Sequence, residues 1–273
     1  MACKTVQIHR STFYYESKES EFVKKLVEEL YELAERYPYY GYEKTTQKLN
    51  RGAWHVNEKR IQRLRRREGI RVELKPKKRS RGGKSTRRRQ RALYPNHVWA
   101  LDFITDRTED GRNIKILNIV DEFSRLNVSL EMGRHFRAAD VIAALGRAML
   151  EYGIPACLRA DNGPEFIAKK LKAWIAESGL GIVYIDPGCP WQNPYVESFH
   201  NIMRNECLNR ELFMHILEAK VVIEDWRDEY NTERPHGSHG GKTPKEVFRE
   251  FIPSWRLRLQ EGMAKDHRGE YLH

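Results

Sequence analysis

The sequence predicts an α/β protein in which a mixed five-stranded sheet is flanked by helices and preceded by a small all-α domain of helix-turn-helix type. Three observations lead to this prediction. After residue 95, apolar patterns follow the order βββαβαβα, which predicts a mixed sheet with helices on its faces. Before residue 75, apolar residues recur at helical spacing. A basic run at residues 75–91 separates the two halves.

The composition is that of a globular protein. The 273 residues suffice for one large domain or two smaller ones, and 40% are hydrophobic. No stretch approaches ~18 consecutive apolar residues, so we expect no transmembrane helix and no membrane partner. The first residues lack the apolar region of a secretory signal. The cysteines form no CxxC pair, which favours a reduced, cytoplasmic setting; they are Cys3, Cys157, Cys189 and Cys207.

Charge divides the chain into two unlike halves. Residues 1–95 hold 26 basic and 11 acidic residues, whereas residues 96–273 hold 23 basic and 27 acidic ones. Such an asymmetry indicates a module that binds a polyanion, with nucleic acid as the default partner; a solvated basic face is the alternative. We expect a helical DNA-binding region at 1–74, a basic linker at 75–94, a second domain with C-terminal helices at 95–255 and a tail at 256–273.

The basic run contains ten Lys and Arg residues and no apolar residue, so we expect a flexible linker. Each cation that neutralises a phosphate releases a counterion and adds affinity without sequence preference. The alternative is a mere spacer, which does not need ten positive charges. The linker residues expected to contact DNA are Lys77, Lys78, Arg79, Arg87, Arg88 and Arg89.

The first half predicts three helices, at 21–36, 42–50 and 58–68, with Asn57 as the N-cap of the third and Gly69 as its stop. Two short helices, a tight turn and a basic last helix are typical of helix-turn-helix geometry. A basic helix kept for solubility is the other interpretation, and the adjoining linker favours DNA. The outward residues expected to contact DNA are Lys59, Arg60, Arg63 and Arg66.

The second half predicts an antiparallel meander of three strands, at 97–106, 113–120 and 125–132. Two shorter strands follow, at 156–160 and 181–185. The helices are expected at 137–151, 165–178, 194–206 with Asn193 as cap, 215–230 and 243–252.

Three carboxylates fall at informative places. Asp102 lies inside an apolar strand, where a charge is costly unless it is paired or binds a metal. Asp161 directly follows a short strand, where α/β folds present catalytic groups. Glu197 lies early in a helix, and 35 residues separate it from Asp161. Taken singly, Asp161 could be a turn former and Glu197 a favourable charge near a helix N-terminus. The joint pattern is harder to explain structurally.

Several words of the sequence occur together in the order typical of one family. They are YGYEKTTQKLN, NEKRIQRLRRREGI, VWALDFIT, LNIVDEFSR, RADNGPEFIA, PGCPWQNPYVESFH and YNTERPH. With the D…D-x35-E spacing, they resemble the DDE superfamily of integrases and transposases. The closest likeness is to the second-frame products (OrfB) of bacterial insertion sequences, whose core is related to retroviral integrase.

The resemblance implies an RNase H-like core in which Asp102, Asp161 and Glu197 form the catalytic, metal-binding triad for two Mg²⁺ or Mn²⁺ ions. It implies a transposase that cleaves the element's ends and transfers their 3′-hydroxyls to target DNA. The implied partners are double-stranded DNA, further copies of this chain and the first-frame product (OrfA), at the nucleoid in a bacterial cytoplasm. A nuclease without strand transfer and a catalytically decayed DNA-binding protein are the alternatives.

Phosphodiester chemistry independently favours such residues. Two divalent ions about 3.5–4 Å apart can activate the attacking oxygen and stabilise the leaving one. Mg²⁺ prefers carboxylate oxygens and retains waters, so three carboxylates leave positions open for phosphate and nucleophile. In this hypothesis Asp102 bridges both ions, while Asp161 holds one and Glu197 the other.

The helix of Glu197 offers further candidates. His200, Asn201 and Arg204 lie three, four and seven residues after Glu197, so they share its face and are expected to touch DNA. A surface ion pair with Glu197 or Glu206 is the alternative for Arg204.

Two positions depart from the family's pattern. Pro194 stands where the family usually has Gly; it is acceptable at the first position of a helix but is expected to stiffen the preceding loop. His239 stands where Leu is common, which could loosen local packing.

Overall fold

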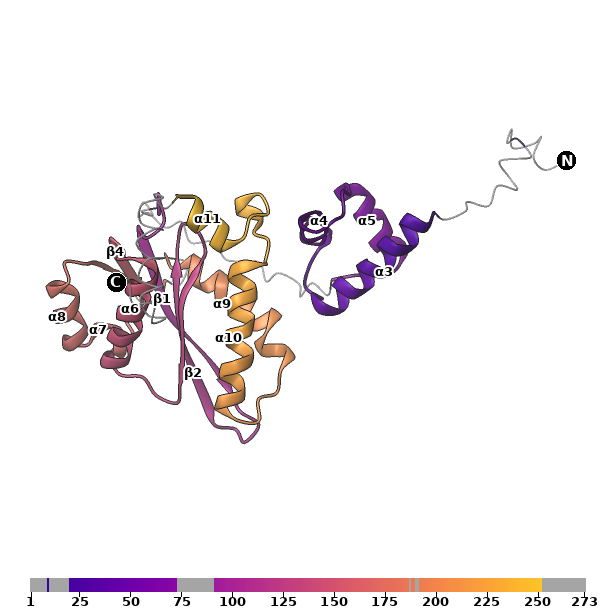
Figure 1. Cartoon of the computed structure of the whole chain (residues 1–273). Helices are drawn as coiled ribbons and strands as arrows, with labels where there is room; N and C mark the ends of the chain where they lie inside the picture. Colours follow the sequence, from indigo (N-terminus) through magenta and orange to yellow (C-terminus); the bar gives the residue numbers. More distant parts are fainter. Residues whose placement is uncertain (1–8, 10–19, 73–90, 187, 190–191, 252–273) are drawn as a thin grey trace, which may run out of the picture. The chain divides into compact units, whose positions relative to one another are not determined.

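The computed structural model describes residues 9, 20–72, 91–186, 188–189 and 192–251 (Figure 1). The chain divides into two compact units, Met1–Lys75 and Pro76–His273, and each is considered by itself. The tail expected at 256–273 and most of the linker expected at 75–94 lie outside the described residues. So do the six linker cations expected to contact DNA, Lys77, Lys78, Arg79, Arg87, Arg88 and Arg89.

The first unit contains the three predicted helices, α3 (Glu21–Arg36), α4 (Tyr42–Arg51) and α5 (Glu58–Arg67). The Asn57 side chain accepts a hydrogen bond from the Lys59 amide, so the predicted N-cap is confirmed. Gly69 has a φ of +71°, a conformation that glycine adopts without strain, and it follows the helix end as predicted. The helices enclose a small apolar core of Leu26, Leu30, Leu49, Val56, Ile61 and Leu64.

The second unit is built on a five-stranded sheet in the order β3-β2-β1-β4-β5. Its strands are β1 (Val98–Arg107), β2 (Asn113–Asp121), β3 (Asn127–Gly133), β4 (Cys157–Ala160) and β5 (Gly181–Tyr184). The first three form the predicted antiparallel meander, whereas β4 and β5 pair in parallel. The predicted α/β class and mixed sheet are therefore confirmed.

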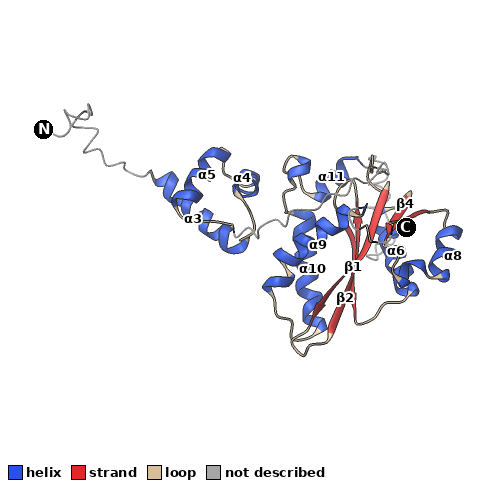
Figure 2. Cartoon of the chain, turned by 180° about the vertical axis from the view of Figure 1, so that it is seen from behind, coloured by secondary structure: helices blue, strands red, loops and turns tan. Residues whose placement is uncertain are grey.

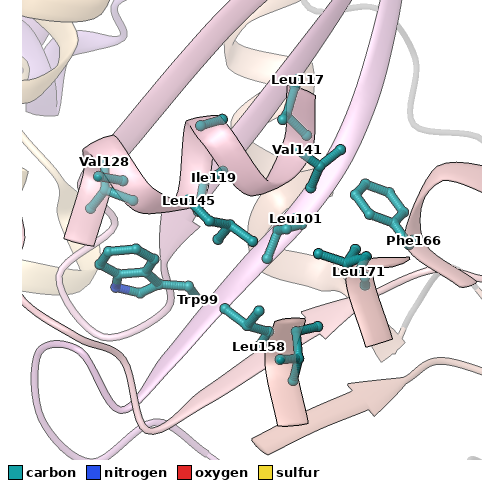
Figure 3. Packing of buried hydrophobic residues seen from close by; sticks show 14 of the residues in the cluster. Trp99, Leu101, Leu117, Ile119, Val128, Val141, Leu145, Leu158, Phe166 and Leu171 are labelled. Atoms are coloured by element: carbon teal, nitrogen blue, oxygen red, sulfur yellow. The ribbon is translucent and has the colours of Figure 1, made fainter. Parts of the chain in front are cut away.

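Helices cover both faces of this sheet (Figures 1 and 2). One face packs against α6 (Ala138–Tyr152), α7 (Pro164–Ile167) and α8 (Lys169–Glu177). Figure 3 shows this layer, in which Trp99 and Leu101 of β1 meet side chains of these helices. Because successive side chains of a strand point to opposite faces, Ala100 and Ile104 join a second core. That core packs against α9 (Pro194–Glu206) and α10 (Ile216–Thr232).

The remaining described elements are short: η2 (Leu208–Arg210), η3 (Gly237–His239) and α11 (Pro244–Phe251). Two predictions about helices are wrong in detail. The helix expected at 165–178 is two helices, because Ala168 adopts an extended conformation with ψ of 136° between α7 and α8. Asn193 precedes α9 but its side chain caps nothing; it donates instead to the Leu101 carbonyl oxygen at 3.3 Å. No helix among the described residues is long and apolar enough to cross a membrane.

Candidate active site

Parallel pairing of the two central strands places two of the predicted carboxylates next to each other. Ala100 of β1 is in register with Arg159 of β4. Asp102 lies two residues further along β1, and Asp161 lies two residues further along the other strand, directly after β4. Since paired strands lie about 4.8 Å apart, the two aspartates emerge as neighbours at this end of β4.

Glu197 comes to the same place from another layer. It lies in the first turn of α9, and this helix packs on the sheet face to which Asp102 also points. Val196, Phe199 and Met203 anchor the helix there because all three are buried in the second core. Pro194 occupies the first position of α9, where its missing N–H costs no helical hydrogen bond.

Asp102 senses the charges of both other carboxylates. The pKa of Asp102 is raised from 3.8 to about 6, chiefly by burial and further by the negative charges of Asp161 and Glu197. The Phe103 amide opposes this shift by donating to Asp102 Oδ1 at 2.8 Å. A carboxylate beside two others, in a partly dry setting, lacks the positive charge that would stabilise its ionised form.

Other acidic side chains around this end of the sheet have basic partners. Glu165, just after Asp161, forms an ion pair with Lys115 of β2. Asp106, on the same strand as Asp102, faces Arg204 with Oδ2 and Nη1 3.5 Å apart. Among the described residues, no Lys or Arg forms a salt bridge with Asp102, Asp161 or Glu197. The three predicted residues therefore differ from Glu165 and Asp106, which face a Lys and an Arg.

His200 contacts Asp102 without neutralising it. Its Nδ1 lies 3.6 Å from Asp102 Oδ2, which is too long for a hydrogen bond. Burial, reinforced by the charge of Arg204, lowers the pKa of His200 to about 4, so the ring is neutral at pH 7. The Asn118 side-chain amide faces His200 Nε2 at 3.1 Å. Since this amide nitrogen can only donate, the imidazole proton is assigned to Nδ1, on the Asp102 side.

Asn118 is itself part of a buried polar chain. It stands opposite Asp102 in the β1–β2 register and is completely buried. Its Oδ1 accepts from Asn127 Nδ2 at 3.3 Å, and Asn231 of α10 binds both the amide and the carbonyl of Asn127. Sequence reasoning missed these asparagines. The one available signal was polar residues at inward positions of otherwise apolar strands.

The turn after β4 shapes the Asp161 carboxylate. The Gly163 amide donates to Asp161 Oδ1 at 2.9 Å. A Cβ at Gly163 would come within 3.0 Å of that oxygen, so only glycine permits this approach without displacement. The Asn162 side chain donates to the Ile185 carbonyl at 2.6 Å and ties the turn to the end of β5.

The donor set suits a hard divalent cation. Carboxylate oxygens are the ligands that Mg²⁺ prefers, and the pKa of Asp102 is raised by burial and, less strongly, by repulsion that such a cation would relieve. Over the part of the chain that the structure covers, no three His, Cys, Asp or Glu side chains lie close enough together to hold one ion as they stand. A single ion held by three of these side chains would therefore require them to rotate toward one another.

The expected DNA contacts of α9 have different surroundings. Asn201 is exposed, as a contact residue must be. His200 is mostly buried against Asn118 and Asp102, so its expected role as a DNA contact is not supported. Arg204 donates to the Thr105 carbonyl at 2.7 Å and faces Asp106. The alternative considered for Arg204 was an ion pair with Glu197 or Glu206, and the structure shows Asp106 as its acidic neighbour instead.

In the first unit, the predicted outward face of α5 is present. Lys59, Arg60, Arg63 and Arg66 are all exposed, and Arg60 also stacks on Phe22 with 4.9 Å between guanidinium carbon and ring centre. The neighbouring Arg65 is buried and donates to Thr45 Oγ1 at 3.0 Å, which shows that not every cation of this helix is available to a ligand.

Comparison with known families finds matches to both units. Family profiles described as "Integrase core domain" match residues 92–190 and 178–244, and one described as "HTH-like domain" matches residues 18–79.

Two curated relatives match along most of their length. An uncharacterized 31.7 kDa protein of insertion element IS407 from Burkholderia multivorans is 36% identical over 247 residues, covering 90% of this chain and 88% of the relative. The putative transposase InsK for insertion sequence element IS150 from Escherichia coli is 27% identical over 89% of this chain and 90% of its own.

A solved structure matches part of the chain. It is a simian T-cell lymphotropic virus intasome in complex with the PP2A regulatory subunit B56 gamma. The TM-score is 0.52 at 18% identity, over 58% of this chain and 56% of that one. This likeness concerns the fold alone, and it agrees with the RNase H-like architecture expected from the sequence.

Proposed function

The chain belongs to the family of insertion-sequence transposases with an integrase core domain, and we propose that Asp102, Asp161 and Glu197 are the residues at which it cuts and joins DNA. The observation that carries this assignment is the convergence of three carboxylates from β1, the end of β4 and α9 without a Lys or Arg partner in the described structure. Other acids nearby, such as Glu165, are neutralised.

Each carboxylate has a distinct task in this proposal. Asp102, Asp161 and Glu197 would hold two Mg²⁺ or Mn²⁺ ions, with Asp102 shared between them and Asp161 and Glu197 each assigned to one. When bound, the ions supply neutralisation of the phosphodiester charge and activation of the attacking oxygen. His200 lies beside Asp102 with its Nδ1–H on the side of that carboxylate, 3.6 Å from Oδ2. The Gly163 amide holds the Asp161 carboxylate in position by a hydrogen bond.

Substrate DNA is held by other parts of the chain. The exposed cations of α5 lie on one short helix of an HTH-like unit, which favours major-groove or backbone contact. Asn201 lies on the exposed part of the face of α9 that carries Glu197. We assign DNA contact to Lys59, Arg60, Arg63, Arg66, Asn201 and the six linker cations.

The partners follow from the reaction. Two element ends must be cut and joined together, which requires more than one copy of the chain. The first-frame product (OrfA) is proposed as a further partner, and the nucleoid as the place of action because DNA is the substrate.

The test is cleavage of a labelled duplex that carries the element's end, in Mg²⁺, by the wild type and Glu197→Gln. We expect cleavage by the wild type alone, leaving 3′-hydroxyl ends that join to a second duplex. Glu177→Gln is the matched control, because it removes the same charge from an exposed residue of α8. Equal cleavage by Glu197→Gln and Glu177→Gln would refute the assignment.

The joining step separates the proposal from its alternatives. A nuclease of the same fold would cut without transferring the 3′-hydroxyl to a second duplex. A decayed DNA-binding protein would bind tightly and with strong salt dependence but would not cut, even when OrfA is added.

A further inference from the structure

Helix α9 has a second functional face. Tyr195, Ser198 and Ile202 lie three and four residues apart, on a different side of the helix from Glu197 and Asn201. They line a cavity of about 370 Å³ that is closed by the β2–β3 turn, by α10 and by the segment around Ser238. The active-site carboxylates do not line this cavity.

The cavity contains a cation with spare hydrogen-bonding capacity. The guanidinium carbon of Arg125 lies 3.9 Å from the centre of the Tyr195 ring, so the side chain is stacked in a fixed position. Its Nη1 is buried and has no hydrogen-bond partner in the described part of the chain. This nitrogen can therefore donate to an acceptor that enters the cavity.

No acidic side chain lines the cavity to take that role. Two carboxylates close enough to sense the charge of Arg125 are Asp121 and Glu122. Asp121 accepts hydrogen bonds from Ser124 and from the Asn96 amide, and Glu122 pairs with Arg159. Neither carboxylate forms a salt bridge with Arg125 among the described residues, although Glu122 Oε2 also lacks a hydrogen-bond partner, and the guanidinium is available to an anion in the cavity.

The backbone conformation of Arg125 also favours a functional role for this residue. Arg125 has a φ of 68°, in the left-handed region where side chains other than glycine or asparagine are strained. Its amide donates to the Asp121 carbonyl at 2.9 Å, and its own carbonyl accepts from Tyr230 Oη at 3.1 Å. Glycine would satisfy this turn with less strain. An arginine at such a position is typical of strain retained for function.

We propose that this cavity binds a phosphate group of the DNA backbone, with Arg125 as the principal ligand and Ser198 as a second donor. The planar guanidinium fork matches two phosphate oxygens at once. The proposal rests on the proposed function insofar as DNA is the substrate. Because Ser198 directly follows Glu197, a phosphate held here fixes a DNA strand beside the helix turn that carries the catalytic glutamate.

The test measures binding of a labelled duplex to the full chain in EDTA, at several salt concentrations. Arg125→Asn removes the guanidinium but keeps a residue that tolerates positive φ. Arg147→Asn is the matched control, because Arg147 is exposed on α6 and pairs with Glu131. We expect Arg125→Asn to weaken binding about tenfold and to lower the salt slope by about 0.9. We expect Arg147→Asn to change neither.

If Arg125→Asn does not fold, Ser198→Asp tests the same cavity. Ser198 is exposed, so a carboxylate there repels phosphate without disturbing the turn, and affinity should again fall. Affinity and slope equal to those of the control would overturn the proposal. A second outcome would also overturn it. Inorganic phosphate, at constant ionic strength, would raise the Tm of the wild type but not of Arg125→Asn, while both proteins bind DNA equally. The cavity would then bind free phosphate rather than a DNA phosphate.

This experiment separates two failures. A wild-type chain that does not bind the duplex contradicts the proposed function itself. A wild-type chain that binds, with Arg125→Asn indistinguishable from Arg147→Asn, contradicts only the cavity. No step of the test depends on metal or on cleavage.

Discussion

Two acidic side chains of the core domain, Asp102 and Glu122, have similarly raised pKa values, but only Glu122 has a cation beside it. Burial raises the pKa of Asp102 to about 6 and that of Glu122 to about 7. Glu122, whose side chain is 0% exposed, forms a salt bridge with Arg159. Asp102, whose side chain is 26% exposed, faces two further carboxylates and a neutral imidazole. A raised pKa alone therefore does not mark an active site. What distinguishes Asp102 is that the described protein supplies it no cation.

This comparison predicts that substitutions at the two sites change different properties: loss of Asp102 lowers catalysis, and loss of the cation beside Glu122 lowers stability. The largest expected effect is on catalysis. Asp102→Asn removes the negative charge and one of the two oxygens that would bind the ions, and metal ions contribute several kcal/mol to such reactions. We expect cleavage to fall by about a thousandfold or more. Folding should be unaffected, because the substitution also removes repulsion from Asp161 and Glu197. Single-turnover cleavage of the labelled duplex measures the loss.

Glu122→Gln is the comparison variant for that assay. It should keep at least a tenth of the wild-type cleavage rate per folded molecule. If Asp102→Asn cuts as fast as Glu122→Gln, the two groups are equivalent and the assignment of the active site is wrong.

The second prediction concerns stability. Arg159→Met leaves Glu122 buried without its cation, and breaking a buried pair from one side costs about 3–5 kcal/mol. Urea unfolding at pH 7 should show this loss, whereas Asp102→Asn should not lower the free energy of unfolding, because it removes an ionised carboxylate whose pKa is raised in the folded state. Arg147→Met is the control, because its pair with Glu131 is exposed and is worth about 0–1 kcal/mol. A loss no larger than in the control would mean that Glu122 is not held by Arg159.

A third prediction uses pH. Because the folded-state pKa of Asp102 is raised, the stability it contributes is fully present below its ordinary pKa of 3.8 and is lost as pH rises through about 6. A divalent ion competes with that proton. Mg²⁺ should thus stabilise the protein little at pH 5 and increasingly as pH passes 6, reaching about 2.7 kcal/mol at about 100 times its Kd.

Thermal unfolding with Mg²⁺ and with EDTA, across that pH range, measures the difference. Glu122 shifts stability in the same direction, but its contribution does not depend on Mg²⁺. Asp102→Asn should abolish the Mg²⁺-dependent part. A Mg²⁺ effect of equal size at pH 5 and pH 8 would contradict binding at Asp102.

The sequence predicted the position of the triad better than its environment. Alternation along β1 placed Asp102 with Ala100 and Ile104, and the strand end placed Asp161, because both rules depend only on local geometry. The role of Asn193 was misjudged, since its side chain binds the Leu101 carbonyl, 92 residues away. The burial of His200 likewise depends on Asn118 of a distant strand. Contacts of that kind have no local pattern.

The smallest predicted effect tests whether Asn118 positions the site. Asn118 donates to His200 Nε2 and so keeps the proton on Nδ1, toward Asp102. Asn118→Leu keeps the branching and number of heavy atoms but removes this donor, and loss of such an outer partner costs about 10-fold or more in metal affinity. We expect a higher Mg²⁺ concentration for half-maximal cleavage, with a nearly unchanged rate at saturation. Asn113→Leu, at the exposed start of β2, should change neither. A merely structural role would lower stability and leave the Mg²⁺ requirement as it is, so that outcome would remove Asn118 and His200 from the active site.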